Sequence, residues 1–248
     1  DTHCHLEKQY YDNIDEVIDR MKNNIIITSG VDYKTNVEVL EMCEKYDNVF
    51  GTLGYHPEEI EGFSLDSLKF LEDNINNPKI VAIGEIGLDC YYGKDDIEKQ
   101  KEVFIAQLRL AAKYNKPVVV HSRDAIKDTY DILKEELKGN KCILHCYSSS
   151  LEMAKEFQKL GIKFGIGGVI TFKNNKVLRE VVEGLTLDNF ILETDSPYLT
   201  PEPYRGHKNE PYNVNYVAKK IAELKNISIE EVISITTKTA ISQFDLPI

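Results

Sequence analysis

The sequence predicts an α/β fold, a distorted (β/α)8 barrel of the TIM type with extra C-terminal helices. Three observations support this fold. Short apolar runs alternate with longer amphipathic stretches over the 248 residues, as in βαβ units that form a parallel sheet. The seven steps from His5 to Asp195 average about 27 residues, which is normal for a barrel of roughly 250 residues. No linker or low-complexity tract interrupts the chain, so residues 1–248 are predicted to form a single domain.

The strands are predicted from short runs of apolar residues. Each run is continuous rather than alternating, as expected for strands that are covered on both faces. Residues 2–5 are expected to be the end of a first strand, which brings the number to eight. The predicted strands are 2–5, 25–29, 49–54, 80–86, 117–121, 142–146, 164–168 and 190–194.

The helices are predicted between these runs. The clearest is 97–115, which has apolar residues at helical spacing and ends at an asparagine. Residues 210–248 are expected to form C-terminal helices that close the barrel. The predicted helices are 12–22, 34–47, 65–76, 97–115, 124–138, 150–160, 174–183 and 210–225.

Acidic residues outnumber basic ones. The chain has 41 Asp and Glu against 30 Lys and Arg, a formal net charge of −11, and 42% hydrophobic residues. This is the composition of a globular protein rather than a disordered or fibrous one. A net negative field repels phosphate, so the charge argues against tight wrapping by nucleic acid or binding to an anionic membrane. Any phosphate-binding site must therefore be local.

The sequence favours a cytoplasmic protein. No uncharged stretch approaches the roughly 18 residues needed to span a bilayer, so no membrane association is expected, and the N-terminus shows no secretory signal. The chain starts at Asp1 without a methionine, so residues are expected to be missing upstream. Five cysteines without a CxxC pair favour reduced thiols. A zinc–thiolate site at Cys142 and Cys146 is a disfavoured alternative.

Polar residues gather at the predicted strand ends. Five of the six histidines fall there, and in a barrel these ends meet at the face that carries active sites. Glu85 and Asp195 share this register within apolar strands, where an unpaired carboxylate costs several kcal/mol. Cations are therefore expected nearby. The five histidines are His3, His5, His56, His121 and His145.

Two histidines two residues apart in a strand point to the same side, so both His3 and His5 are expected to face the barrel interior. Imidazoles together with carboxylates make a divalent-metal site, and the ligand count supports two ions. We expect Glu85 to bridge them. The first metal is assigned to His3, His5, Glu85 and Asp195, and the second to Glu85, His121 and His145.

Seven motifs of the chain together resemble the TatD-type metal-dependent deoxyribonucleases of the amidohydrolase-like superfamily, over essentially the whole length. The motifs are DTHCHL, GYHPEE, IGEIGLD, VVVHSRDA, LHCYS, LETDSPYL and PYRGHKNEP. The resemblance implies a distorted TIM barrel, a two-metal site and hydrolysis of DNA. The metal-ligand pattern of the family matches all six assigned ligands, and further active-site positions match His56 and Glu193. His207 stands where a lysine or arginine is frequent, which affects substrate contacts rather than metals.

The expected mechanism is an in-line attack on the phosphodiester by a hydroxide that two metals activate. Asp195 is expected to orient the attacking water and accept its proton. His56 is expected beside the scissile phosphate as a hydrogen-bond or proton donor, and Glu193 to orient a metal ligand. With the bridging Glu85, these residues form the predicted catalytic set.

Phosphate contacts are expected from basic residues at the same face, and stacking on unpaired bases from nearby tyrosines. The resemblance implies DNA with single-stranded or frayed ends as the partner. The basic candidates are Arg123, Lys173, Arg205 and Lys208. The tyrosine candidates are Tyr55, Tyr92, Tyr147, Tyr198 and Tyr204.

Two other functions fit the same set of residues. A small-molecule amidohydrolase that cleaves an amide, lactone or cyclic urea would use the same barrel, but such enzymes often carry a modified lysine where this chain has Glu85. A non-catalytic metal-binding scaffold predicts lost ligands, and none is lost.

The mixed ligands accept Zn, Mn, Co or Fe, and Mg less readily. Neither GxGxxG nor GxxxxGK[ST] is present, so no nucleotide cofactor is expected.

Overall fold

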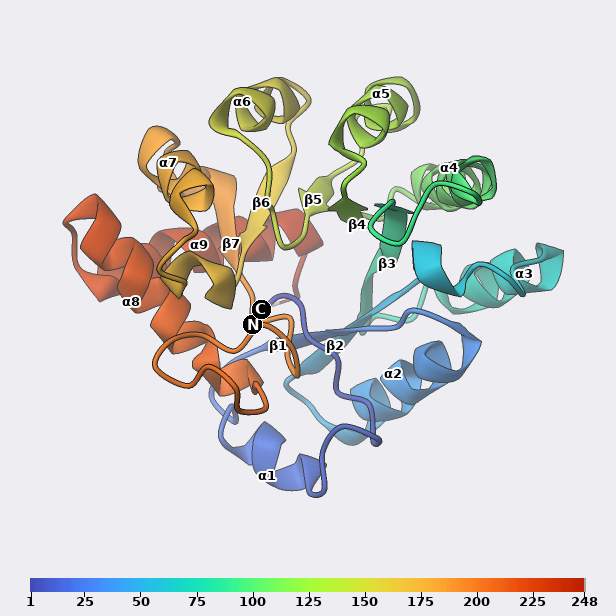
Figure 1. Cartoon of the computed structure of the whole chain (residues 1–248). Helices are drawn as coiled ribbons and strands as arrows, with labels where there is room; N and C mark the ends of the chain where they lie inside the picture. Colours follow the sequence, from blue (N-terminus) through green and yellow to red (C-terminus); the bar gives the residue numbers. More distant parts are fainter. Residues whose placement is uncertain (248) are drawn as a thin grey trace.

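The computed structural model describes residues 1–247. Within them a parallel sheet of seven strands curls into a barrel, with the strands neighbouring one another in sequence order, and the helices lie around its outside (Figure 1). The strands are β1 (Ile26–Ser29), β2 (Val49–Leu53), β3 (Ile80–Asp89), β4 (Val118–Arg123), β5 (Cys142–Leu144), β6 (Lys163–Ile166) and β7 (Phe190–Leu192).

Each of the eight predicted helices is present, with ends that differ by a few residues, and a further helix, α9, lies within the C-terminal region 210–248 that was expected to be helical. They are α1 (Ile14–Asp19), α2 (Tyr33–Lys45), α3 (Leu65–Asn74), α4 (Ile97–Lys113), α5 (Ile126–Glu136), α6 (Leu151–Lys159), α7 (Lys176–Gly184), α8 (Val214–Lys225) and α9 (Ile229–Phe244). Short 3-10 turns lie at Pro57–Glu59, Gly168–Thr171, Leu187–Asn189 and Pro211–Asn213. The expected helix 210–225 starts only at Val214, because the chain first makes the 3-10 turn that begins at Pro211.

The eighth strand that was expected to end at residues 2–5 is present only as isolated β-bridges. Of the residues described, only Cys4 in this segment makes β-bridges, one to Thr28 of β1 and one to Ser196 beyond β7. The backbone nitrogen of Cys4 donates to the carbonyl of Ile27 at 3.2 Å, and that of His5 donates to the carbonyl of Ser196 at 2.7 Å. The segment divides its few hydrogen bonds between two neighbours, so it closes the barrel without forming a strand.

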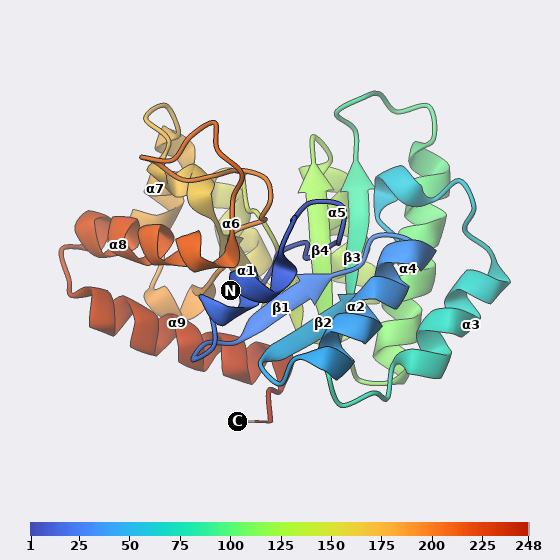
Figure 2. The same cartoon turned by 90° about the horizontal axis from the view of Figure 1, so that it is seen from below.

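The barrel interior is apolar at its lower end, which is the end where the strands begin. Figure 2 shows the strands pointing toward one end of the molecule, with α9 lying beneath the opposite end. Buried residues of six strands form one cluster there with Ala240 and Phe244 of α9. Burying such side chains stabilises the fold by about 1.5–3 kcal/mol each. The strand residues are Ile27, Phe50, Val81, Ala82, Val119, Ile143 and Ile191.

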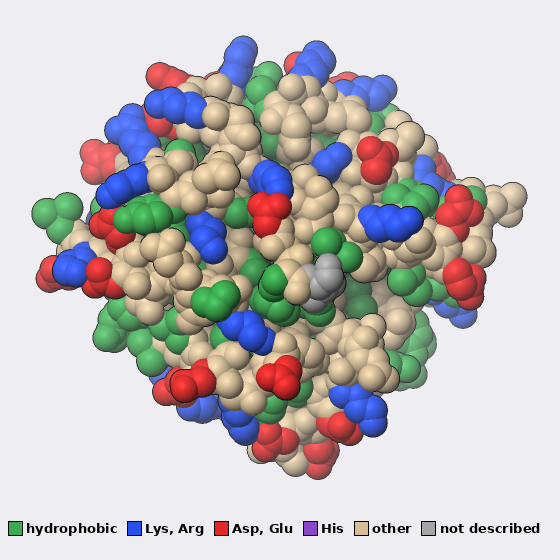
Figure 3. All heavy atoms as spheres, turned by 180° about the vertical axis from the view of Figure 1, so that it is seen from behind, with side chains coloured by type: hydrophobic (Ala, Val, Ile, Leu, Met, Phe, Trp, Pro, Cys, Tyr) green, Lys and Arg blue, Asp and Glu red, His purple; other side chains and the backbone are tan. Residues whose placement is uncertain are grey.

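Because apolar side chains fill the lower end of the barrel, the polar residues lie at the opposite end, where the strands finish. Figure 3 shows the lower face, where lysines, arginines, acidic residues and apolar side chains are mixed, and none of the described histidines is visible. Among residues 1–247, no helix is both long enough and apolar enough to cross a membrane.

Candidate active site

A cleft of about 700 Å³ opens where the strands end. In barrels of this kind the loops that follow the strands build the active site. The sixth predicted ligand, His3, is buried beside this cleft. The predicted ligands that line the cleft are His5, Glu85, His121, His145 and Asp195, together with His56.

Some of these residues lie within strands, and others lie directly after them. Glu85 and His121 lie within β3 and β4, and the register of this strand pair shifts beside Glu85. Such an irregularity re-aims a side chain. His145 directly follows β5, and Asp195 lies just beyond β7 with a positive φ of 55°, a conformation that aspartate tolerates better than most residues.

One oxygen of Glu85 faces the two histidines of the N-terminal segment. Its Oε2 lies 3.3 Å from Nε2 of His3 and 3.6 Å from Nε2 of His5. The same two nitrogens lie 3.7 Å and 3.5 Å from Oδ1 of Asp195. Ser29 contacts the far side of both rings, through its Oγ to Nδ1 of His3 and its carbonyl to Nδ1 of His5. Two imidazoles and two carboxylates therefore surround one point.

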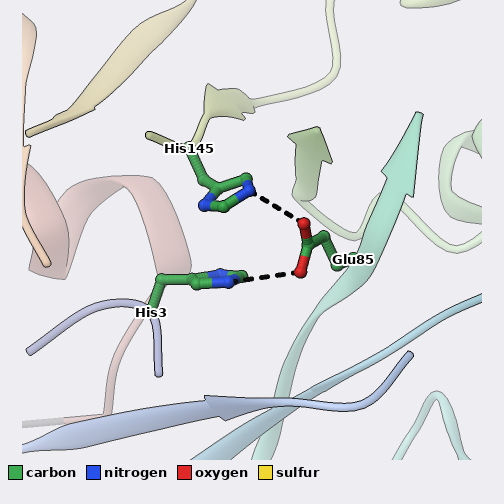
Figure 4. Close-up of side chains that lie close together, drawn as sticks. All are labelled: His3, Glu85 and His145. Carbon is green, nitrogen blue, oxygen red and sulfur yellow. Dashed lines mark ion pairs between the residues drawn. The ribbon is translucent and has the colours of Figure 1, made fainter. Parts of the chain in front are cut away.

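The other oxygen of Glu85 faces a second set of imidazoles. Its Oε1 lies 2.8 Å from Nε2 of His145 and 3.0 Å from Nδ1 of His121. Nε2 of His56 is 3.4 Å from the same oxygen. Figure 4 shows the rings of His3 and His145 directed at different oxygens of the one carboxylate. Glu85 thus lies between two ligand groups.

The charges of this cluster depend on one another. Burial alone would raise the pKa of Glu85, but His145, His56 and His3 hold it well below its ordinary value. Burial alone would lower the pKa of His145, but the Glu85 carboxylate outweighs it and the pKa is raised. The pKa of His3 is lowered by burial and by the neighbouring His145. Within the metal-free cluster the pKa shifts of His3 and His145 therefore run in opposite directions.

The donor set fits divalent metal ions. Among the described residues, Nε2 of His3, Nδ1 of His145 and Oε2 of Glu193 are buried side-chain atoms without a hydrogen-bond partner, and such atoms are costly unless a ligand satisfies them. Cys142 and Cys146 are free thiols, and neither belongs to the candidate metal-binding groups found in residues 1–247. Those groups are His3 with Glu85 and His145, His3 with His5 and Asp195, and His56 with Glu85 and His121.

Glu193 is fully buried behind His145. Its Oε1 accepts a hydrogen bond from the backbone nitrogen of Cys146 at 2.5 Å and lies 3.6 Å from Nδ1 of His145. The side chain is 0% exposed, so it cannot touch a substrate in the cleft. Its position matches the expected role of orienting a ligand, and that role stays a prediction.

The four predicted phosphate-binding residues are not equivalent. Arg123 lines the cleft, and its guanidinium lies 3.5 Å from the centre of the Tyr91 ring. Of the residues described around the cleft, Lys173, Arg205 and Lys208 are not part of its lining. Arg205 stacks instead on the ring of Phe172.

The five predicted tyrosines also differ in whether they line the cleft and whether they are exposed. Tyr92 and Tyr198 line the cleft and are exposed, and Tyr204 is exposed on the loop after β7. Tyr147 lines the cleft but is buried, with its hydroxyl donating to the carbonyl of Ser150. The prediction of Tyr55 as a stacking residue is wrong, because it is 4% exposed and packs in the core.

Sequence reasoning missed several residues of the site. Asp89 is buried beside His121, and the carboxylates of Glu7, Glu58 and Glu59 line part of the cleft. For Asp89 a signal was present, because it follows Glu85 by four residues in the same apolar strand and therefore points to the same side. Glu7 lies on a loop, and Glu58 and Glu59 lie in the short 3-10 turn after β2, where no periodicity indicates direction.

Comparisons with known proteins agree with this geometry. A family model described as TatD related DNase matches residues 1–245. The uncharacterized metal-dependent hydrolase YabD of Bacillus subtilis (strain 168) is 42% identical over 245 residues, 97% of this chain and 96% of that protein. The uncharacterized metal-dependent hydrolase MJ1582 of Methanocaldococcus jannaschii is 39% identical over 250 residues, with 98% and 96% covered.

The fold also has a close counterpart among solved structures. The crystal structure of YJJV, a TatD homologue from Escherichia coli K12, has a TM-score of 0.92 and 30% sequence identity to this chain. The match covers 100% of this chain and 98% of that one. The predicted TIM-type barrel is therefore confirmed.

Proposed function

The chain belongs to the family of TatD-related DNases and is a metal-dependent hydrolase, and from this premise we propose that it hydrolyses phosphodiester bonds of DNA. We expect exonuclease action on single-stranded or frayed ends, with two divalent metal ions per chain.

The position of Glu85 carries this proposal. Its two oxygens face two separate groups of imidazoles, as expected of a carboxylate that bridges two metals. Two-metal sites of this kind occur in phosphatases and nucleases, where they act on both the attacking and the leaving oxygen. We assign the first metal to His3, His5, Glu85 and Asp195, and the second to Glu85, His121 and His145, with His56 nearby.

The protein's own residues would divide the remaining work. When bound, the metal ions would lower the pKa of water and neutralise charge on the phosphate. The Asp195 side chain is 16% exposed and so reaches the cleft, where we assign it to orient the attacking water and accept its proton. Nδ1 of His56 accepts a hydrogen bond from the backbone nitrogen of Glu58, so its neutral ring carries the proton on Nε2. That nitrogen points into the ligand cluster and is placed to donate to the phosphate or leaving oxygen.

The charge around the cleft supports binding of a strand end. Glu7, Glu58 and Glu59 line one side, on the loops after the N-terminal segment and β2. Arg123 ends β4 and also lines the cleft, whereas Arg205 lies on the loop after β7, outside that lining. The phosphates of a DNA strand would be attracted to Arg123 and repelled from the three glutamates, so the strand would end near the metals rather than pass across them.

A small-molecule amidohydrolase is the second candidate. The cleft volume of about 700 Å³ falls within the roughly 300–1,000 Å³ typical of small-ligand sites. The acidic lining would suit a substrate that carries a positive group. The DNA proposal is preferred because Arg123 lies in the cleft beside the cluster.

A substrate panel separates these candidates. Protein stripped of metal and reloaded with Zn, Mn, Co, Fe or Mg is assayed on single-stranded DNA, duplex DNA, RNA, simple esters and cyclic amides, each with and without a chelator. We expect chelator-sensitive release of nucleotides from single-stranded DNA. Turnover of amides without cleavage of DNA would refute the proposal in favour of the second candidate. Binding of metal without turnover of any substrate would favour a non-catalytic scaffold.

A further inference from the structure

Asp89, the last residue of β3, is buried against His121. The side chain is only 2% exposed, and each of its two oxygens accepts one hydrogen bond. Oδ2 lies 2.8 Å from Nε2 of His121, and Oδ1 accepts from the backbone nitrogen of Tyr91 at 2.8 Å. Both acceptors of the carboxylate are thus occupied by donors that lie in fixed positions.

The backbone of Asp89 is held as firmly as its side chain. The side-chain amide of Gln100 on α4 accepts from the Asp89 nitrogen and donates to the Asp89 carbonyl, both at 2.9 Å. Gln100 is itself buried. This two-way pairing fixes where the Asp89 carboxylate points, so the ring of His121 meets a rigid acceptor.

The ring of His121 is oriented differently from the other histidine rings that face Glu85 in the part of the chain that the structure describes. His3, His5, His56 and His145 all turn Nε2 toward Glu85, whereas His121 turns Nδ1 toward it. A neutral imidazole carries one proton, and the hydrogen bond made by one nitrogen decides which nitrogen is free to bind metal. His121 lies between two carboxylates, with Nε2 beside Asp89 and Nδ1 beside Glu85. With a metal ion bound at Glu85, the Asp89 contact would keep the proton on Nε2 and leave the lone pair of Nδ1 for the metal.

We propose that Asp89 is a positioning residue that fixes the ring and tautomer of His121, so that Nδ1 is presented to the second metal. A carboxylate behind a ligating histidine orients the ring and strengthens its binding to metal. The inference rests on the proposed pair of metals but not on DNA as the substrate.

Asp89→Asn tests this with little change in shape. In asparagine an NH2 group replaces one of the two carboxylate oxygens, so only one of the two donors, Tyr91 or His121, still faces an acceptor. If its oxygen faces Tyr91, its nitrogen faces His121 and requires the proton to move to Nδ1. We expect the second of two metal ions to bind about 10–100-fold more weakly in calorimetric titration of stripped protein, while the first binds within threefold of wild type.

Asp32→Asn is the matched control. Asp32 lies at the same end of the barrel and also accepts a hydrogen bond from a backbone nitrogen, that of Thr35, through Oδ1. Its recorded side-chain contacts are to Thr35 and not to an imidazole. We expect wild-type affinity for both ions in this variant. Binding of both ions by Asp89→Asn within threefold of wild type would overturn the proposal.

A second readout needs no mutation. The ¹⁵N chemical shifts of His121 in zinc-loaded protein report which nitrogen carries the proton and which binds metal. We expect the proton on Nε2 in wild type, and finding it on Nδ1 would overturn the proposal even if Asp89→Asn did not fold. If wild type bound no metal but kept the Nε2 proton, the metal proposal would fail while the contact itself would stand.

Discussion

Gly165 leaves the space that the carboxylate of Glu193 occupies. A Cβ atom added at Gly165 would lie 2.1 Å from Oε2 of Glu193, well inside van der Waals contact. The glutamate has little freedom to withdraw, because it is fully buried and its Oε1 holds the backbone nitrogen of Cys146. A glycine in β6 therefore sets the position of the carboxylate behind His145.

Gly165→Ala should displace Glu193 and weaken the site. Overpacking of a buried position costs about 1–3 kcal/mol, so the free energy of unfolding should fall by that amount, and hydrolysis should fall more than stability explains. Gly62→Ala is the control, since a Cβ there meets nothing within 4 Å. Equal activity of the two variants in the chosen assay would show that Glu193 has no role in positioning His145.

Metal binding should stabilise the folded protein. An ion at 100 times its dissociation constant contributes about 2.7 kcal/mol at each site, so removal of metal should lower Tm by several degrees, as scanning calorimetry would show. Zn or Mn should restore Tm more effectively than Mg, which prefers oxygen ligands. Glu85→Gln should lose most of the effect. A Tm that is insensitive to Zn would contradict the assigned sites.

The metal-free protein should lose stability as the solution becomes alkaline. The raised pKa of His145 adds stability that is complete below its ordinary value of 6.5 and is lost as pH rises through the raised value. The lowered pKa of Glu85 adds stability that is present above 4.5 and is lost as pH falls through the lowered value. The contribution of this pair is therefore complete between about 4.5 and 6.5.

Urea unfolding of stripped protein over a pH series measures this. We expect the free energy of unfolding to fall above pH 6.5, and to fall less in Glu85→Gln, which lacks the charge that raises the pKa of His145. A stability that stays constant or rises there would contradict the electrostatic account. Metal-loaded protein should show the opposite trend, because imidazoles must lose protons to bind metal.

Arg123→Ala should weaken binding of DNA. A hydrogen bond to a charged group contributes about 1.5 kcal/mol, so KM for single-stranded DNA should rise by about tenfold and the salt dependence should fall by about one phosphate contact. Arg205→Ala should have a smaller effect, because Arg205 is outside the cleft lining. Lys159→Ala is the control, as this lysine pairs with Glu156 on α6. If all three variants matched wild type, neither Arg123 nor Arg205 would have a part in binding.

Much of the fold was predictable because the signals are local. Continuous apolar runs marked β3 and β4, and helical spacing marked α4 within two residues of its ends. The segment around Cys4 was misjudged because its status depends on how hydrogen bonds are shared between two neighbouring strands. That sharing is a tertiary property that a short sequence segment does not encode.

The ligand cluster was predictable for a similar reason. His3 and His5 are two residues apart, and an extended backbone places both on one side. Both rings face Glu85 in the structure, although the segment is not a strand. The burial of Tyr55 and the acidic side formed by Glu7 and Glu58 were not predictable, because they depend on how loops fold over the barrel end. Asp89 was within reach, since its spacing from Glu85 places both on the same side of one strand.

Metal titration of stripped protein tests the central claim most directly, when bound ions per chain and release of nucleotides from single-stranded DNA are followed together. If Glu85 bridges two metals that act together, hydrolysis should stay low until the first ion is bound and should rise as the second ion binds. Full hydrolysis with one ion per chain would contradict the account. So would two bound ions without any release of nucleotides.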